Sequence, residues 1–152
     1  MIVTPMQAAK IMAETSGFQL SNLQIQKILY LAHMWRLYSR DGMPLITEHF
    51  EAWDYGPVVP SLYHKLKAYG AGPVKNIFRT TSVENVPEPT RRLLVSAVER
   101  FGNVPPGALV QLTHRDNGAW ARNYCGSWDS AVIPNSDIRE EAGELYGKSR
   151  AS

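Results

Sequence analysis

The segment that decides the fold is SNLQIQKILYLAHMWRLYSR, residues 21–40. Ser21 is a residue type that favours the position just before a helix, and Asp41-Gly42 favours its end. Apolar residues recur at helical spacing on one face and again on a second face. A helix that is apolar nearly all round is buried by neighbours on several sides, so we expect 21–40 to be a buried central helix. The two stripes are Ile25, Ile28, Leu29, Ala32 and Trp35, and Leu23, Tyr30, Met34 and Leu37.

Shorter helices and a small β element are predicted around this central helix. Thr4 and Pro5 favour the start of a first helix, and Asn135 or Ser136 favours capping of the last one. We therefore expect a mainly α fold, a compact single-domain helical bundle over 1–152 with a small β element, whose tail at 148–152 frays. The patterns predict helices over about 5–16, 59–69, 90–101, 106–112, 120–124 and from 136 onward, strands over about 48–54 and 131–133, a turn at Tyr55-Gly56-Pro57, and a connecting stretch at 71–90 with room for one short strand at Val74–Phe78.

Composition limits the function classes. The chain has 152 residues, of which 44% are apolar and 20% charged, so its bulk is not disordered. The net charge is +2 and neither half is strongly basic, so nucleic acid is an unlikely partner. The start of the chain shows no leader pattern and no run of 18 apolar residues exists, so we expect a cytoplasmic protein without a membrane anchor.

The residues that could carry chemistry do not form a known catalytic pattern. The four histidines, His33, His49, His64 and His114, show no pair at helical ligand spacing, and Cys125 is the single cysteine. A zinc site built from local spacing is therefore absent, and we expect no metal and no cofactor. We expect His33 at the edge of the core and Cys125 as a small buried apolar residue.

Three carboxylates within seven residues leave an enzyme open as an alternative. Glu48, Glu51 and Asp54 lie on the predicted strand, and with His114 they offer acid and base groups. A general acid and base need environments that push their pKa values apart, and the sequence does not show such environments. A solvated strand face is the favoured interpretation, because surface carboxylates are commonly inert.

The aromatic residues indicate the function more strongly than the carboxylates do. Tyr and Trp gather in two stretches outside the central helix, beside the turns at 55–57 and 116–118. Most are expected to be core residues, but Tyr and Trp beside turns are also the anchors that protein interfaces use. The sequence therefore favours a binding module over an enzyme. The residues concerned are Trp53, Tyr55, Tyr63, Tyr69, Trp120, Tyr124 and Trp128.

Three blocks resemble the Panacea domain, the SocA-like antitoxin family that also includes phage-associated GepA-like proteins. LQIQKILYLAH at 23–33 is similar to the family's LQKLLYYAQ helix, and AWDYGPVVPSLY at 52–63 is similar to its AW-x-YGPV-x-P-x-LY signature. Leu112-Thr113-His114, followed by Trp120, resembles its third block. The resemblance extends over about 5–146, and three blocks in order are a specific signal.

The resemblance implies a compact, mainly helical antitoxin that binds a cognate toxin protein encoded nearby and neutralises it without catalysis. One family member instead delivers its toxin to the ClpXP protease, so a proteolytic adaptor is an alternative, and a phage accessory protein that binds a host factor is another. The oligomeric state is left open. We expect the partner-binding residues to be Trp53, Asp54, Tyr55, Tyr63, His114, Arg115 and Trp120.

Two positions depart from the family pattern. Asp54 stands where a basic or neutral residue is more usual, which alters the charge of the loop expected to meet the partner. Ala119 stands where a proline often precedes the tryptophan, which weakens the start of a helix.

Overall fold

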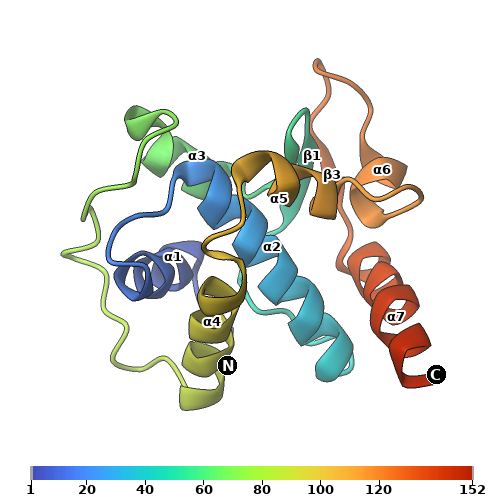
Figure 1. Cartoon of the computed structure of the whole chain (residues 1–152), viewed down its shortest axis with the longest axis horizontal. Helices are drawn as coiled ribbons and strands as arrows, with labels where there is room; N and C mark the ends of the chain where they lie inside the picture. The colour runs from blue at the N-terminus through green and yellow to red at the C-terminus, as the bar shows by residue number, and fades with distance from the viewer. Residues whose placement is uncertain (1, 152) are drawn as a thin grey trace.

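Helix α2 (Asn22–Ser39) runs through the middle of the computed structural model (Figure 1), which describes residues 2–151, with side chains for residues 2–147. The tail at 148–152, where the sequence predicts fraying, lies outside the residues whose side chains are described. Ser21 begins α2 with a capping box, in which the Ser21 hydroxyl accepts from Gln24 N and the Gln24 side chain accepts from Ser21 N. Most of the α2 side chains are buried, as the two apolar stripes predict.

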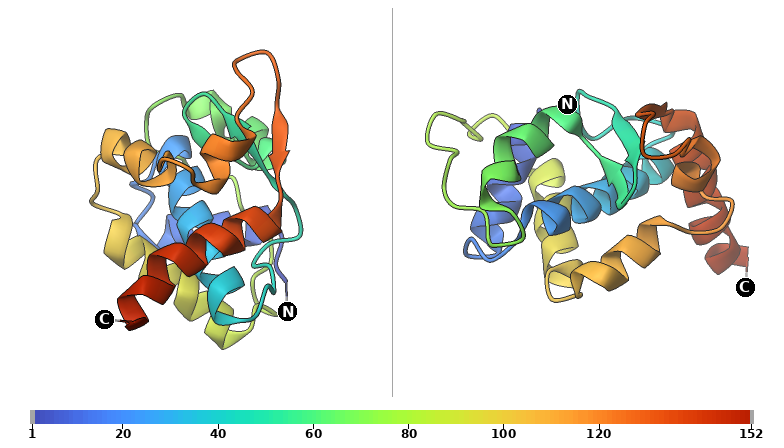
Figure 2. Two further views of the ribbon diagram at one scale, coloured as in Figure 1. Left: turned by 90° about the vertical axis from the view of Figure 1, so that its right-hand side faces the viewer. Right: turned by 90° about the horizontal axis from the view of Figure 1, so that it is seen from above.

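The other helices surround α2 on several sides. α1 (Pro5–Thr15) and α4 (Glu88–Phe101) pack against each other and against one side of α2, and α7 (Asn135–Ala151) packs along another side (Figure 2). α5 (Pro106–Thr113) crosses α2, and α3 (Pro60–Leu66) lies near its start. This contact on several sides explains why α2 has no polar face.

A three-stranded antiparallel sheet lies beside α2. Its order is β2 (Gly56–Val58), β1 (Phe50–Trp53), β3 (Ala131–Ile133). Trp53 pairs with Gly56 across a tight turn, where Gly56 has a φ of 116°, a value that favours glycine. Pairing of β1 with β3 brings the segment before β3 next to the β1–β2 turn, and this pairing positions the site described below.

The mainly α fold with a small β element is confirmed. The predicted helices at 5–16, 21–40 and 90–101 match α1, α2 and α4 within about two residues, and the predicted strands at 48–54 and 131–133 match β1 and β3 equally closely. Short helices α5 and α6 (Ala119–Asn123) also occur where the sequence predicts them. Among residues 2–151, none of the helices combines the length and the apolar character that crossing a membrane requires.

Five local predictions differ from the structure. Val74–Phe78 is not a strand, since Ser21 and Pro73 form only an isolated bridge there. Gly56-Pro57 belongs to strand β2 rather than to a turn. The predicted helix over 59–69 ends at Leu66 and continues as the 3-10 helix η1 (Lys67–Tyr69).

The fourth wrong prediction concerns Cys125, which is exposed. Its aromatic neighbours in the sequence lie in the loop at 124–130 and do not enclose it, and Trp128 is 99% exposed. The fifth difference concerns His33, which is fully buried rather than at the edge of the core. Both of its ring nitrogens have hydrogen-bond partners there, so the buried ring is satisfied.

Candidate partner-binding site

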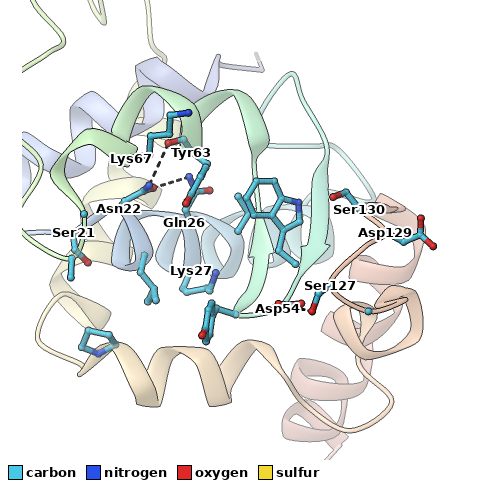
Figure 3. A pocket seen from close by; sticks show the side chains of 18 residues that line it. Ser21, Asn22, Gln26, Lys27, Asp54, Tyr63, Lys67, Ser127, Asp129 and Ser130 are labelled. Atoms are coloured by element: carbon cyan, nitrogen blue, oxygen red, sulfur yellow. Dashed lines mark hydrogen bonds between the residues drawn. The ribbon is translucent and has the colours of Figure 1, made fainter.

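A pocket of about 620 Å³ lies between the start of α2, the β1–β2 turn and the loop at 124–130. Figure 3 shows Asn22, Gln26 and Lys27 along α2, with Asp54 and Ser127 bonded to each other. Tyr63 and Lys67 close the pocket from the α3–η1 segment. Residues far apart in the sequence thus share one cavity. The apolar part of the lining includes Leu23, Trp53, Tyr55, Val58, Tyr63, Ala71 and Pro106.

Lys27 lies in the wall of this pocket and is 1% exposed. Its Nζ donates to the carbonyl oxygen of Pro57 at 3.1 Å. Burial lowers the pKa of Lys27 to about 7, because the charged ammonium loses its hydration. Gly56 makes room for this side chain, since a Cβ at position 56 would lie 2.7 Å from Lys27 Cε.

Asn22 and Gln26 form a polar network above Lys27 on the same helix. Gln26 Nε2 donates to Asn22 Oδ1 at 3.2 Å, and Gln26 Oε1 accepts from Val59 N at 2.9 Å. Asn22 Nδ2 donates to the carbonyl oxygen of Tyr63 at 3.4 Å. These bonds fix the α2 wall of the pocket to the strand and helix that follow the β1–β2 turn.

Asp54 joins the β1–β2 turn to the loop at 124–130. Its carboxylate accepts from the hydroxyl of Tyr124 and, at 2.8 Å, from Ser127 Oγ. The bonds from Tyr124 and Ser127 lower the pKa of Asp54, while the carboxylate raises the pKa of Tyr124. Asp54 is therefore a structural link between two segments of the pocket rim, as well as an exposed charge.

An aromatic stack supports the pocket from behind. The His114 and Trp120 rings lie 3.5 Å apart and nearly parallel, and Trp120 stacks in turn on Tyr124 at 4.6 Å. Trp120 Nε1 donates to the carbonyl oxygen of Trp53 at 2.7 Å. Burial, and to a lesser degree the positive charge of Lys27, lowers the pKa of His114. The buried Nε2 of His114 has no hydrogen-bond partner among the described residues.

The profile of the family described as "Antitoxin SocA-like, Panacea domain" matches residues 25–121. The chain belongs to this family. A curated relative, "Antitoxin SocA" of Caulobacter vibrioides (strain NA1000 / CB15N), is 31% identical over 114 residues, which are 66% of this chain and 58% of that protein. This chain thus covers less than two thirds of the length of that relative. No solved structure matches the chain.

The three Panacea blocks meet at the pocket. The block at 23–33 supplies Lys27, and the block at 52–63 supplies the β1–β2 turn and Tyr63. The third block lies behind them, because Trp120 binds the backbone of Trp53. The loop at 124–130, which closes the pocket on another side, lies outside the range that the family profile matches.

Of the seven residues predicted to bind a partner, four line the pocket and three do not. Trp53, Asp54, Tyr55 and Tyr63 are in the lining. His114 and Trp120 stack behind it, and Arg115 faces Glu141, with Nη1 and Oε2 3.5 Å apart. The interface role of these residues stays a prediction.

The sequence analysis did not identify Lys27 as a pocket residue. It named Trp128 only as one of seven aromatic residues and did not predict its exposure. The burial of Lys27 could have been found, because a charged residue within a helix that is apolar nearly all round has no exposed face available. The 99% exposure of Trp128 had no local signal, because it depends on the path of the loop at 124–130.

The three carboxylates considered for catalysis are each bound to a different partner. Glu48 accepts from the Ser61 hydroxyl, and Glu51 accepts from Trp53 Nε1 at 3.0 Å. The Asp54 carboxylate accepts hydrogen bonds from the hydroxyls of Tyr124 and Ser127. Among the described residues, no group of three His, Cys, Asp or Glu side chains is arranged to hold a metal ion.

Proposed function

We propose that this protein is an antitoxin that neutralises a cognate toxin protein, encoded nearby, by binding it directly. Family membership and the name of the matched relative support the antitoxin role. The site described above adds a candidate for the surface that meets the toxin.

The observation that carries the proposal is the exposure of two large aromatics on the segments that form the pocket. Tyr55 is 72% exposed and lines the pocket, and Trp128 is 99% exposed in the loop whose Gly126, Ser127 and Asp129 line it. Exposed Tyr and Trp beside a cavity are typical of interface anchors, because burying them against a partner releases a large apolar area from water.

We propose binding rather than catalysis. The hydrogen bonds made by Glu48, Glu51 and Asp54 connect segments of this protein and do not direct the three carboxylates to one point. A stoichiometric partner fits this arrangement better than a turnover reaction. Replacement of Glu48 or Glu51 by alanine is expected to leave neutralisation intact, and loss of neutralisation in either variant with the fold retained would favour an enzyme.

The test is co-expression of this chain with the product of the adjacent reading frame. We expect that product to arrest growth alone and to be harmless with this chain. Tyr55→Ala combined with Trp128→Ala should abolish the rescue, because both anchors are lost. Met43→Ala is the matched control, since Met43 is also an exposed apolar side chain, at 46%, and is not part of the pocket. A harmless neighbour product, or a lethal one that this chain does not rescue, would refute the proposal.

The amount of toxin in the same cells separates two ways of neutralising it. Masking by direct binding predicts a stable toxin in a complex of fixed stoichiometry with this chain. A proteolytic adaptor predicts that the toxin level falls when this chain is present and recovers when a ClpXP-type protease is deleted. A harmless toxin that no longer purifies with this chain would exclude masking.

A further inference from the structure

The Lys27 amine is buried, and the residues that the structure describes supply no counter-ion for its charged form. Among the described side chains, no carboxylate lies within 4 Å of its Nζ, and the Pro57 carbonyl is its one acceptor. An ammonium group has three N–H donors, so two of them have no acceptor among the described side chains and backbone. Burial of an unpaired charge is costly, and such a group is normally paired or in a functional site.

The pocket wall carries a second cation and the positive end of a helix. Lys67 is exposed at the rim, on the side toward Asn22 and Gln26 in Figure 3. Ser21 and Asn22, at the N-terminus of the 18-residue helix α2, also line the pocket, and the N-terminus of a helix attracts negative charge. This part of the cavity is therefore complementary to an anion.

The other residues that line the pocket limit the kind of anion that it can bind. Leu23, Trp53 and Val58 supply apolar surface next to the two lysines, so the anion needs an apolar body. Asp54 and Asp129 lie toward the other side of the pocket in Figure 3, where they repel a doubly charged group more strongly than a singly charged one. A singly charged carboxylate on an apolar or aromatic body therefore fits this wall better than inorganic phosphate, which has no apolar body and carries more negative charge.

We propose that this pocket binds a carboxylate of the partner, an acidic side chain or the chain terminus of the toxin, with Lys27 as its counter-ion. The proposal rests on the proposed function for the source of the carboxylate. It assigns the specificity of the site to charge at Lys27 and Lys67 and to the apolar wall beside them. A nearby anion also favours the charged form of Lys27, whose pKa of about 7 leaves both forms populated in a neutral solution.

The first arm of the test uses a probe in place of the toxin. Phenylacetate and its neutral amide, phenylacetamide, have almost the same shape and differ in charge. We expect phenylacetate, titrated into the full chain and followed by backbone amide NMR, to shift the Asn22, Gln26 and Lys27 signals with a dissociation constant on the order of 1 mM. The amide should bind at least about tenfold more weakly. Equal affinity for both compounds would overturn the proposal.

Variants assign the effect to the two lysines. Lys27→Met should remove the preference for the acid over the amide. Lys67→Glu changes an exposed residue, so we expect the protein to stay folded. The change places a negative charge at the same end of the pocket and should weaken phenylacetate binding. Lys65→Glu makes the same charge change at an exposed position outside the pocket and is the matched control. An effect of Lys65→Glu equal to that of Lys67→Glu would overturn the assignment.

The second arm repeats the variants with the toxin. Lys67→Glu should weaken toxin binding at least about tenfold relative to Lys65→Glu, because a negative charge then faces the incoming carboxylate. Toxin binding that neither Lys27→Met nor Lys67→Glu changes would overturn this site and leave the proposed function. Phenylacetate binding at the pocket by a chain that does not bind the toxin would overturn the proposed function and leave the carboxylate site.

Discussion

The backbone N–H of Ala119 donates to Oε1 of Glu141 at 2.8 Å, and the Glu141 side chain is buried. This bond connects α7 to the first turn of α6, which carries Trp120. A proline at position 119 would have no N–H to donate. The Ala119 N–H is therefore a donor that this chain uses to hold α6, and with it Trp120, against α7.

Removing the Glu141 carboxylate should destabilise the protein. Glu141→Leu leaves the Ala119 N–H buried without an acceptor and Arg115 without its partner, so we expect a loss of about 2–4 kcal/mol in the free energy of unfolding by urea. Glu141→Gln keeps an oxygen acceptor and should lose less. Glu140→Gln, at an exposed ion pair on the same helix, is the control and should change stability by less than about 0.5 kcal/mol. Equal losses at the two positions would contradict the role of Glu141.

Replacing a glycine by alanine near the start of α5 and near the start of α6 should change the stability of the protein in opposite directions. A Cβ on Gly118 would lie 2.8 Å from Oε2 of the buried Glu141, so Gly118→Ala should cost about 1–3 kcal/mol. A Cβ on Gly107 meets nothing within 4 Å, so Gly107→Ala should stabilise by about 0.5–1 kcal/mol through the unfolded chain. Thermal unfolding of the two variants measures the difference, and a stabilised Gly118→Ala would contradict the tight contact.

The sequence predicted the helical frame and two strands, β1 and β3, for a physical reason. The stripes of α2 and the apolar run of β3 are local patterns that tertiary packing reinforces. Val74 and Phe78 are buried, but within residues 2–151 no strand lies beside them to pair with, so the predicted strand does not form. Strand pairing is a tertiary property, and a short apolar run alone does not specify it.

The candidate site was predictable only in part. The signature around Trp53 and Tyr55 identified one wall of the pocket, because residues of one hairpin stay together. The opposite wall depends on bonds from Tyr124 and Ser127 to Asp54, across more than 65 residues of chain. Such contacts have no local pattern, which explains why the exposure of Trp128 was not anticipated.

Acid should unfold this protein in part through His33. The Leu45 N–H donates to Nδ1 at 3.2 Å, so the ring proton is on Nε2 and is donated to Asn135 Oδ1 at 3.0 Å. Burial lowers the pKa of His33 to about 4 from its ordinary 6.5. Between these values the unfolded chain binds a proton that the folded chain does not. This contribution to stability is complete above pH 6.5 and is lost as the pH falls toward 4, at up to about 1.4 kcal/mol per pH unit.

His33→Asn tests this titration. Asparagine keeps an acceptor near the Leu45 N–H and removes the titrating group, so we expect lower stability at pH 7.5 and a smaller loss between pH 6.5 and 4.5 than in the unchanged protein. Urea unfolding across this range measures both. His64→Asn, at an exposed position, is the control for the substitution itself. An unchanged pH dependence in His33→Asn would show that other groups cause the acid sensitivity.

The pocket lysine should lower the stability of the protein in which it lies. The pKa of Lys27 is about 7 in the folded state and 10.5 ordinarily, so between these values the unfolded chain binds a proton that the folded chain does not. Stability should therefore rise with pH across this window, and below pH 7 the full cost of the buried charge is present. Lys27→Met removes that cost, because methionine is unbranched and apolar and fits a similar space.

We expect Lys27→Met to raise the free energy of unfolding most at pH 6 and to lose this advantage by up to about 1.4 kcal/mol per pH unit above pH 7. Urea unfolding at pH 6 and pH 9 measures it, with Lys65→Met at an exposed site as the control. An advantage that grows with pH would contradict the buried charge. A variant that is more stable but no longer prefers a carboxylate would mean that Lys27 is retained at the expense of stability, which is expected of a binding residue and not of a structural one.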